Sequence, residues 1–139
     1  MSTVIVKSQQ DLLYKQEIKA GPFTFLADAP ARVGGKEEAP DPHQLLLASL
    51  GACTAMTLQM FARRRGWDLQ AVSIELSESK TDDPAQPGVH KSTISKDILL
   101  EGNLTSDQKE RLQEVADKCP IHRLLSEPIE IVTTLTSNG

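Results

Sequence analysis

The chain has a long apolar stretch, residues 45–56, which reads LLLASLGACTAM, and small or apolar side chains prevail as far as Met60. The stretch shows no polar face at helical spacing, so it predicts a helix that is buried on most of its sides. A chain of 139 residues offers little material to surround a helix of this length. The stretch therefore predicts a homodimer, in which two copies of the chain bury the helix together.

Both ends of this helix are marked in the sequence. Asp41 is a good N-cap residue, Pro42 suits the first helical position, and Gln44 completes the spacing of a capping box with Asp41. Gly66 follows three arginines and is typical of the residue just past a helix end. We expect the helix to begin at Pro42 and to end near Arg65.

The rest of the chain predicts strands and one further helix. The second helix is expected to begin at Thr105, which has Gln108 at capping-box spacing, and to end before Pro120. The loop of residues 28–41 separates the early strands from the first helix. The fold class is therefore α+β, one domain of residues 1–139 with an antiparallel sheet packed on two main helices. The predicted strands cover residues 3–7, 12–19, 22–27, 71–80, 90–100 and 128–135.

Composition and charge exclude several classes of partner. The net charge of −4 and the pI near 5.3 lack the basic excess that general nucleic-acid binding requires. The N-terminus has no signal-peptide pattern, and we find no run that approaches the roughly 20 apolar residues of a membrane helix. We expect a cytoplasmic protein that binds neither nucleic acid nor membrane. No CxxC or HxxxH spacing indicates a metal site, and no cofactor is expected.

The chain has two cysteines, and their settings differ. Cys53 lies in the middle of the apolar helix, so we expect it to be a buried thiol. Cys119 precedes Pro120 at a helix junction, and His122 and Arg123 follow at positions where both are candidate binding residues beside the thiol. A nearby cation lowers the pKa of a thiol. The hypothesis is a redox pair that the fold brings together; the alternative is two inert core cysteines.

Two residues before the apolar stretch are further candidates. No cation or base lies within one helical turn of Cys53 in the sequence, so a functional Cys53 requires a group from another segment or subunit. Arg32, in the loop before the helix, is the catalytic candidate, because a guanidinium can stabilise a thiolate or a peroxide oxygen. His43 lies about three helical turns from Cys53, too far for direct contact. We keep His43 as a candidate binding residue, with a helix-cap role as the alternative.

Two segments together resemble a known family. Residues 40–58 read PDPHQLLLASLGACTAMTL after a Gly-Gly pair at 34–35, and residues 116–123 read ADKCPIHR. This pattern resembles the OsmC/Ohr superfamily of osmotically inducible and organic hydroperoxide resistance proteins. The sequence around both cysteines is most similar to that of an OsmC-like subgroup with a CPxHR motif at the second cysteine.

The resemblance implies both an assembly and an activity. It implies an intertwined homodimer with sites at the subunit interface, and a thiol peroxidase that reduces organic hydroperoxides in oxidative-stress defence. Cys53 then matches the peroxidatic cysteine and Cys119 the resolving cysteine, and a thiol or dithiol reductant restores both. Arg32 is near the place of the family's arginine, whereas His43 stands where the family's peroxidases have a glutamate. The alternative is a non-enzymatic module that binds a small hydrophobic ligand or senses redox state.

Overall fold

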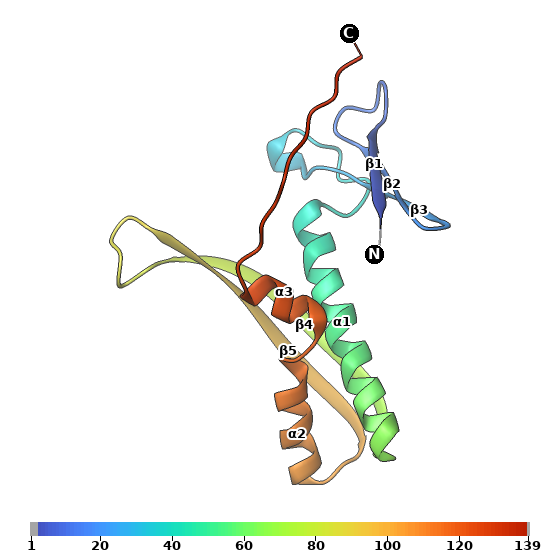
Figure 1. Cartoon of the computed structure of the whole chain (residues 1–139), viewed down its shortest axis with the longest axis vertical. Coiled ribbons are helices and arrows are strands. Elements are labelled where there is room, and N and C mark those ends of the chain that lie inside the picture. Colours follow the sequence, from blue (N-terminus) through green and yellow to red (C-terminus); the bar gives the residue numbers. More distant parts are fainter. Residues whose placement is uncertain (1–2, 139) are drawn as a thin grey trace. The chain divides into compact units, whose positions relative to one another are not determined.

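The computed structural model describes residues 3–138 and has an α+β fold, which confirms the predicted class. The chain divides after Ala48 into two compact units, and helix α1 (Pro42–Arg65) begins in the first and continues into the second (Figure 1). The single domain and the homodimer stay predictions.

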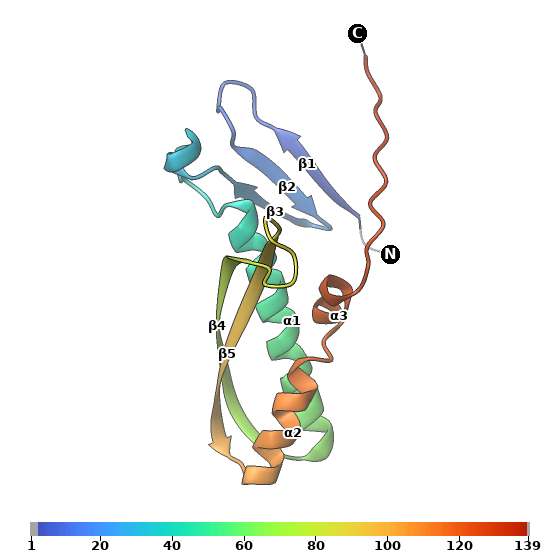
Figure 2. The ribbon, with the colours of Figure 1, turned by 90° about the vertical axis from the view of Figure 1, so that its left-hand side faces the viewer.

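The first unit contains an antiparallel sheet in the order β1-β2-β3, in which Ile18 is the buried residue of the central strand (Figure 2). The strand predicted over residues 12–19 begins only at Gln16. Asp11 and Leu13 have positive φ angles of 66° and 53°, so the preceding backbone forms a turn instead. The strands are β1 (Val4–Ser8), β2 (Gln16–Ala20) and β3 (Phe23–Ala27).

A buried carboxylate organises the loop of residues 28–41. Asp28 accepts hydrogen bonds from the backbone N–H of Ala29 at 2.8 Å and of Glu38 at 3.2 Å. Burial opposes the ionisation of Asp28, but these hydrogen bonds outweigh it and hold the pKa of this carboxyl below its usual value. The loop includes a 3-10 helix, η1 (Ala31–Val33), which carries Arg32.

Helix α1 begins and ends where the sequence predicts. The Oδ1 atom of Asp41 accepts from the backbone N–H of Gln44 at 2.9 Å, and Oε1 of Gln44 accepts from the backbone N–H of Asp41 at 3.0 Å. These two bonds form the predicted capping box. Gly66, with a φ of 67°, supplies the left-handed conformation just past the helix end.

In the second unit, α1 and α2 pack against one face of a long antiparallel hairpin (Figure 2). Their shared core consists of Leu58 and Ala62 from α1 and Leu112, Val115 and Ala116 from α2. Side chains from both strands, Val72 and Ile98 among them, complete this core. The elements are β4 (Asp68–Asp82), β5 (His90–Asn103), α2 (Ser106–Ala116) and α3 (Pro120–Ser126), and the predicted capping box of Thr105 and Gln108 opens α2.

Within the single chain, helix α1 is buried on one side only, so the predicted burial on most sides depends on a second copy and stays a prediction. Its buried stripe is formed by Leu50, Gly51, Thr54, Leu58 and Ala62. Other apolar side chains of the helix face outward, including Met56 and Met60, which are 54% and 56% exposed.

The composition of α1 also corrects the expectation about apolar runs. An 18-residue window of this helix has a mean hydropathy of 1.6, so α1 is long and apolar enough to cross a membrane by length and composition alone. Core helices of soluble proteins meet the same criterion. Within the chain, 28% of that window is buried.

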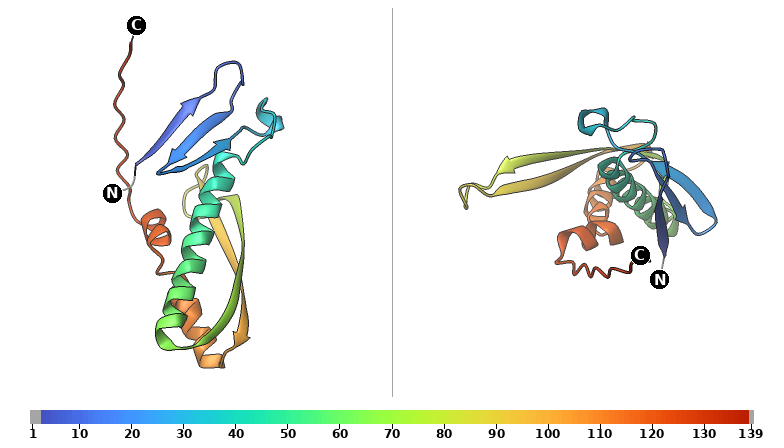
Figure 3. Two further views of the ribbon diagram at one scale, coloured as in Figure 1. Left: turned by 90° about the vertical axis from the view of Figure 1, so that its right-hand side faces the viewer. Right: turned by 90° about the horizontal axis from the view of Figure 1, so that it is seen from above.

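The predicted final strand over residues 128–135 is not formed. After α3, residues 127–138 follow an extended path that belongs to neither sheet of the described chain (Figure 3). Ile131 and Leu135 are 84% and 90% exposed. The apolar pattern of a strand is present here, but a strand also requires a neighbour for its backbone hydrogen bonds, and none is supplied within the described chain.

Candidate functional site

The second unit brings the two cysteines together. Both are free thiols, and hydrogen bonding between the side chains of Cys53 and Cys119 contributes to the ionisation of Cys119. Cys53 is half-buried on α1, whereas Cys119 has no exposed surface. The expectation of Cys53 as the buried thiol is therefore wrong, because α1 is covered on only one side. The buried thiol is that of Cys119, which lies at the junction between α2 and α3.

Cys119 is the N-cap residue of α3. Its Sγ atom accepts a hydrogen bond from the backbone N–H of His122 at 3.3 Å, and Pro120 occupies the first helical turn. The residues after Pro120 therefore form a short helix in addition to the two main helices that the sequence predicted. The cap position directs the thiol towards backbone donors, which favour the thiolate over the thiol.

Thr54 connects Cys119 to α1. Its Oγ1 atom lies 3.4 Å from the Sγ atom of Cys119 and 2.9 Å from the carbonyl oxygen of Leu50, to which it donates. Thr54 is completely buried. A buried hydroxyl requires a partner, and here it has one on its own helix and one on the thiol.

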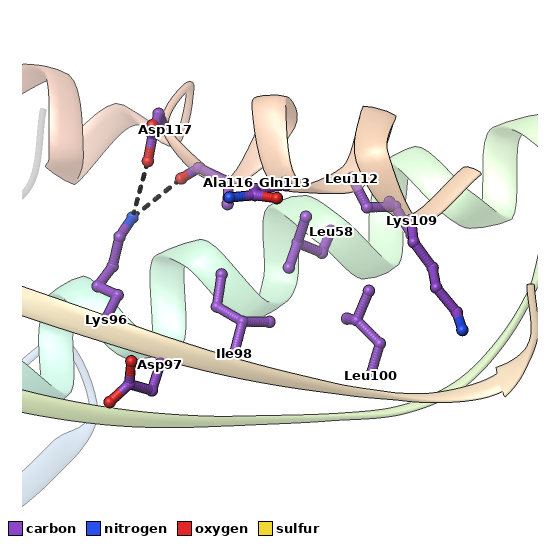
Figure 4. A pocket seen from close by; sticks show the side chains of 10 residues that line it. All are labelled: Leu58, Lys96, Asp97, Ile98, Leu100, Lys109, Leu112, Gln113, Ala116 and Asp117. Atoms are coloured by element: carbon purple, nitrogen blue, oxygen red, sulfur yellow. Dashed lines mark hydrogen bonds and ion pairs between the residues drawn. The ribbon is translucent and has the colours of Figure 1, made fainter. Parts of the chain in front are cut away.

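Lys96 of β5 is a buried cation beside these groups. Its side chain is 9% exposed, and its Nζ atom donates to Oγ1 of Thr54 at 3.1 Å and to the carbonyl oxygen of Ala116 at 3.0 Å. The Nδ1 atom of His122 lies 2.9 Å from the same Nζ atom, and Oδ1 of Asp117 lies 3.9 Å from it. Figure 4 shows Lys96 reaching from the strand to the end of α2.

The surroundings of Cys119 favour its ionised form. Burial raises the pKa of the thiol, but it is outweighed by hydrogen bonds from Thr54, from the backbone of His122 and from Cys53, and by the charge of Lys96. The pKa of Cys119 is therefore lower than that of an ordinary cysteine.

The sequence did not single out Thr54 or Lys96. A signal for Lys96 was present in the alternation of its strand, because the side chains of Ile94, Lys96, Ile98 and Leu100 occupy the less exposed positions of β5. A lysine in an apolar row indicates a buried cation with partners. The hydroxyl of Thr54 had no comparable signal, since small polar residues recur along α1.

The other predicted residues occupy different surroundings. His122 faces Lys96 and also lies 3.8 Å from Oδ1 of Asp117. Arg123 is exposed, and its backbone N–H donates to the carbonyl oxygen of Cys119 at 3.1 Å. Arg32 and His43 are exposed residues of the first unit. The roles expected for these four residues stay predictions.

A groove adjoins the site on the hairpin side. It has a volume of about 590 Å³, with Lys96 at one end and Lys109 at the other (Figure 4). Apolar side chains of α1, β5 and α2 form its wall between the two lysines: Leu58, Ile98, Leu100 and Leu112.

No cluster of three or more His, Cys, Asp or Glu side chains suited to a metal ion occurs within residues 3–138.

Comparison with known proteins identifies relatives of the chain. A family model described as OsmC-like protein matches residues 34–134. The structure is similar to an OsmC-like protein from Mycoplasma pneumoniae, with a TM-score of 0.72 and 18% identity over 91% of this chain and 87% of that chain. It is also similar to the organic hydroperoxide resistance protein OsmC from Legionella pneumophila, with a TM-score of 0.65 and 19% identity over 88% and 87% of the two chains.

A third similar structure is the organic hydroperoxide resistance protein OhrB of Bacillus subtilis, with a TM-score of 0.60 and 20% identity over 88% of each chain. At these identities the structural neighbours establish the fold alone. No protein with curated annotation matches the sequence.

Proposed function

Because the chain belongs to the OsmC-like protein family, we propose that it is a thiol peroxidase that reduces organic hydroperoxides in oxidative-stress defence. Membership confirms the resemblance that the two cysteine motifs indicated. Two of the structural neighbours are named organic hydroperoxide resistance proteins, which supports this class of substrate.

The observation that carries the proposal is the pairing of two free thiols in unequal surroundings. Cys53 is half-buried and therefore the more accessible to a peroxide, while Cys119 is buried among groups that favour its thiolate. A two-cysteine peroxidase requires an accessible cysteine that reacts with the peroxide and a second thiol beside it that resolves the sulfenic acid, and Cys53 and Cys119 suit these two positions.

The proposed reaction has three steps. The thiolate of Cys53 attacks a peroxide oxygen, the O–O bond breaks, Cys53 becomes a sulfenic acid, and the released alkoxide takes up a proton to leave as an alcohol. The thiolate of Cys119 then attacks the sulfur of Cys53, an S–S bond forms, the S–O bond breaks, and the hydroxide leaves as water after protonation. A dithiol reductant is oxidised to its own disulfide as it restores both thiols by exchange.

Arg32 remains the proposed cation for the peroxide oxygen, with His43 as the residue at the position of the family's glutamate. A neutral histidine accepts a hydrogen bond from an arginine, whereas a protonated histidine repels it. The proposal therefore gives His43 a supporting role for Arg32. Conversion of His43 to Glu should raise turnover if a carboxylate at this position supports Arg32 better than an imidazole, and should leave it unchanged if His43 is only a cap residue.

The proposal includes a homodimer. Cys53 shares the exposed side of α1 with Met56 and Met60, and the extended residues 127–138 expose Ile131 and Leu135. A second copy of the chain would cover both apolar surfaces and with them the exposed side of Cys53. Light scattering at micromolar concentration should give twice the mass of the chain. A stable monomer would remove the shared site from the proposal.

The experiment that tests the activity is stopped-flow oxidation of the reduced protein by an organic hydroperoxide and by hydrogen peroxide, with the thiols counted before and after. The wild type should lose both thiols rapidly. Cys53→Ser should abolish the reaction, and Cys119→Ser should arrest it at a sulfenic acid. Thiols that survive an excess of peroxide for many minutes would contradict the proposal. We expect these reactions in a reducing compartment such as the cytoplasm, where a dithiol reductant is available.

The groove of about 590 Å³ favours a second candidate function, a module that binds a small hydrophobic ligand or senses redox state. Its apolar wall suits an apolar molecule, and Lys109 at one end of the groove suits a negatively charged end of that molecule. A fluorescent fatty acid is a suitable probe. Binding of this probe with micromolar affinity, combined with cysteines that resist hydroperoxide, would favour this function over the peroxidase.

A further inference from the structure

The ammonium group of Lys96 is fully satisfied by partners around Cys119. An ammonium has three N–H donors, and Nζ of Lys96 has three acceptors within 3.1 Å, on Thr54, Ala116 and His122. These acceptors belong to α1, α2 and α3 respectively. One buried charge therefore links the three helices that surround the thiol.

The bond to Lys96 also sets the role of the Thr54 hydroxyl. Oγ1 of Thr54 accepts from Lys96, so its own proton is shared between the carbonyl oxygen of Leu50 and the Sγ atom of Cys119. When Cys119 is a thiol, the S–H group donates to Oγ1 and the hydroxyl donates to Leu50. When Cys119 is a thiolate, the hydroxyl can turn and donate to the sulfur. A single rotation thus serves both states of the thiol.

From these contacts we infer that Lys96 is a positioning residue for the second half of the reaction: acting with Thr54, it holds Cys119 as the thiolate that closes the disulfide with Cys53. This inference rests on the proposed peroxidase function for its place in the cycle. The step it serves is the attack of Cys119 on the Cys53 sulfenic acid, in which the S–S bond forms and hydroxide leaves. Lys96 contributes its positive charge and holds the hydroxyl of Thr54 in place, and it forms no bond to the reacting atoms.

The groups that face Cys119 come from every surrounding element. They are Thr54 and Cys53 on α1, Lys96 on β5 and His122 on α3, while Asp117, in the turn after α2, faces Lys96 and His122. Nδ1 of His122 lies 2.9 Å from the Lys96 ammonium, which has only N–H donors, so this nitrogen is placed to accept from it. Asp117 is 69% exposed and lies at the edge of this cluster, so solvent screens its charge. Lys96 is therefore the charge that acts most strongly on Cys119.

The inference is tested first without any peroxide. In a Cys53→Ser background only Cys119 remains as a thiol, so the ultraviolet absorbance of the thiolate reports its ionisation as a function of pH. Lys96→Met should move the midpoint to higher pH, and Lys96→Arg should restore part of the shift. Lys91→Met is the matched control, because Lys91 is an exposed lysine on the same strand. Its midpoint should equal that of the parent.

The second readout is the lifetime of the sulfenic acid in the protein with both cysteines. Lys96→Met should leave the first oxidation of Cys53 unchanged and should slow disulfide closure about tenfold at neutral pH, because a neighbouring opposite charge favours the ionised form by that order. Raising the pH should restore the closure rate of this variant. A purely structural defect would persist at every pH.

Two outcomes would overturn the inference: equal midpoints for Lys96→Met and Lys91→Met, or slow closure that high pH does not restore. If Lys96→Met fails to fold, as judged by circular dichroism, Thr54→Val with Thr54→Ser as its control tests the same link through the hydroxyl. Failure of the peroxidase proposal looks different. In that case no variant forms a sulfenic acid, while the absorbance titration still reports the influence of Lys96.

Discussion

The two cysteines differ in their surroundings: Cys53 is the more accessible to solvent, whereas Cys119 has the polar contacts that favour a thiolate. Cys53 lies on the open side of α1 with Met56 and Met60, where apolar side chains are exposed. Cys119 is fully buried and is contacted by a hydroxyl and a backbone N–H, with a buried ammonium nearby. Of the two thiols, the one with the stronger polar contacts, Cys119, is therefore the one that solvent reaches least.

This difference follows from the position of each cysteine in the fold. Cys53 belongs to a helix that is covered on one side, so its further environment depends on whatever covers the other side. Cys119 lies where α2 ends and α3 begins, and a helix junction offers unpaired backbone groups at both ends. The carbonyl oxygen of Ala116 accepts a hydrogen bond from Lys96, and the backbone N–H of His122 donates to the thiol of Cys119.

The largest expected effect comes from removing the core that supports the Cys119 side. Leu112 is fully buried between α2, α1 and the hairpin, and Leu112→Ala should lower the free energy of unfolding by about 2–5 kcal/mol. Urea denaturation at fixed protein concentration measures this. Leu99→Ala is the control, because Leu99 is 60% exposed, and it should change stability by less than about 0.5 kcal/mol. Equal effects would show that α2 is not held by this core.

A smaller effect is expected from the hydroxyl that links the two regions. Thr54→Val leaves Lys96 and Cys119 each without one partner and should cost about 1–3 kcal/mol. The matched control is Thr57→Val on the same helix, whose hydroxyl donates only to the backbone carbonyl of Cys53, at 2.8 Å. The same urea experiment should show a clearly smaller loss for Thr57→Val. A larger loss of stability for Thr57→Val than for Thr54→Val would show that the bonds of Thr54 to Lys96 and Cys119 do not contribute as proposed.

The N-cap of α2 is expected to contribute about 1 kcal/mol. The hydroxyl of Thr105 accepts from the backbone N–H of Gln108 at 3.1 Å, and Thr105→Ala removes this bond. Ser106→Ala, one residue later and exposed, is the control and should be nearly neutral. Thermal unfolding with both variants checks the difference. Since α2 supports Cys119, Thr105→Ala should also speed amide hydrogen exchange in α2 more than in the part of α1 around Cys53.

The smallest expected effect is a pH dependence of stability. The folded state lowers the pKa of Cys119, so between this pKa and the ordinary value of about 8.5 the unfolded chain binds more protons than the folded one. Stability should therefore rise with pH through this window, and the contribution should disappear as pH falls below the folded pKa. Comparison of reduced wild type with Cys119→Ser across the window isolates it. A wild type that gains no stability over Cys119→Ser as pH rises would contradict the lowered pKa.

The boundaries of helices were largely predictable because they depend on neighbours in sequence. The capping boxes of Asp41 with Gln44 and of Thr105 with Gln108 join residues three positions apart, and Gly66 ends α1 by its own backbone freedom. The strand expected over residues 128–135 failed for the opposite reason. Its side-chain pattern is local, but its hydrogen bonds require another strand.

The candidate site was predictable only in part. The two cysteines and His122 were recognisable by their motifs, and the position of Cys119 at a helix junction followed from Pro120. The burial of Cys119 and the half-burial of Cys53 were not, because burial depends on which side of α1 the hairpin and α2 cover.

The α+β class, the ends of α1 and α2, and the two thiols of an OsmC-like chain could be predicted from the sequence alone, since each depends on residues that are close together in the chain. Which of the two thiols has a charged group beside it depends on the tertiary structure. The pairing of Lys96 with Leu76 in the β4–β5 hairpin sets the position of the lysine beside the helices. Its ammonium then finds acceptors on three helices, and a contact set drawn from such distant segments depends on how they pack, which no local pattern encodes.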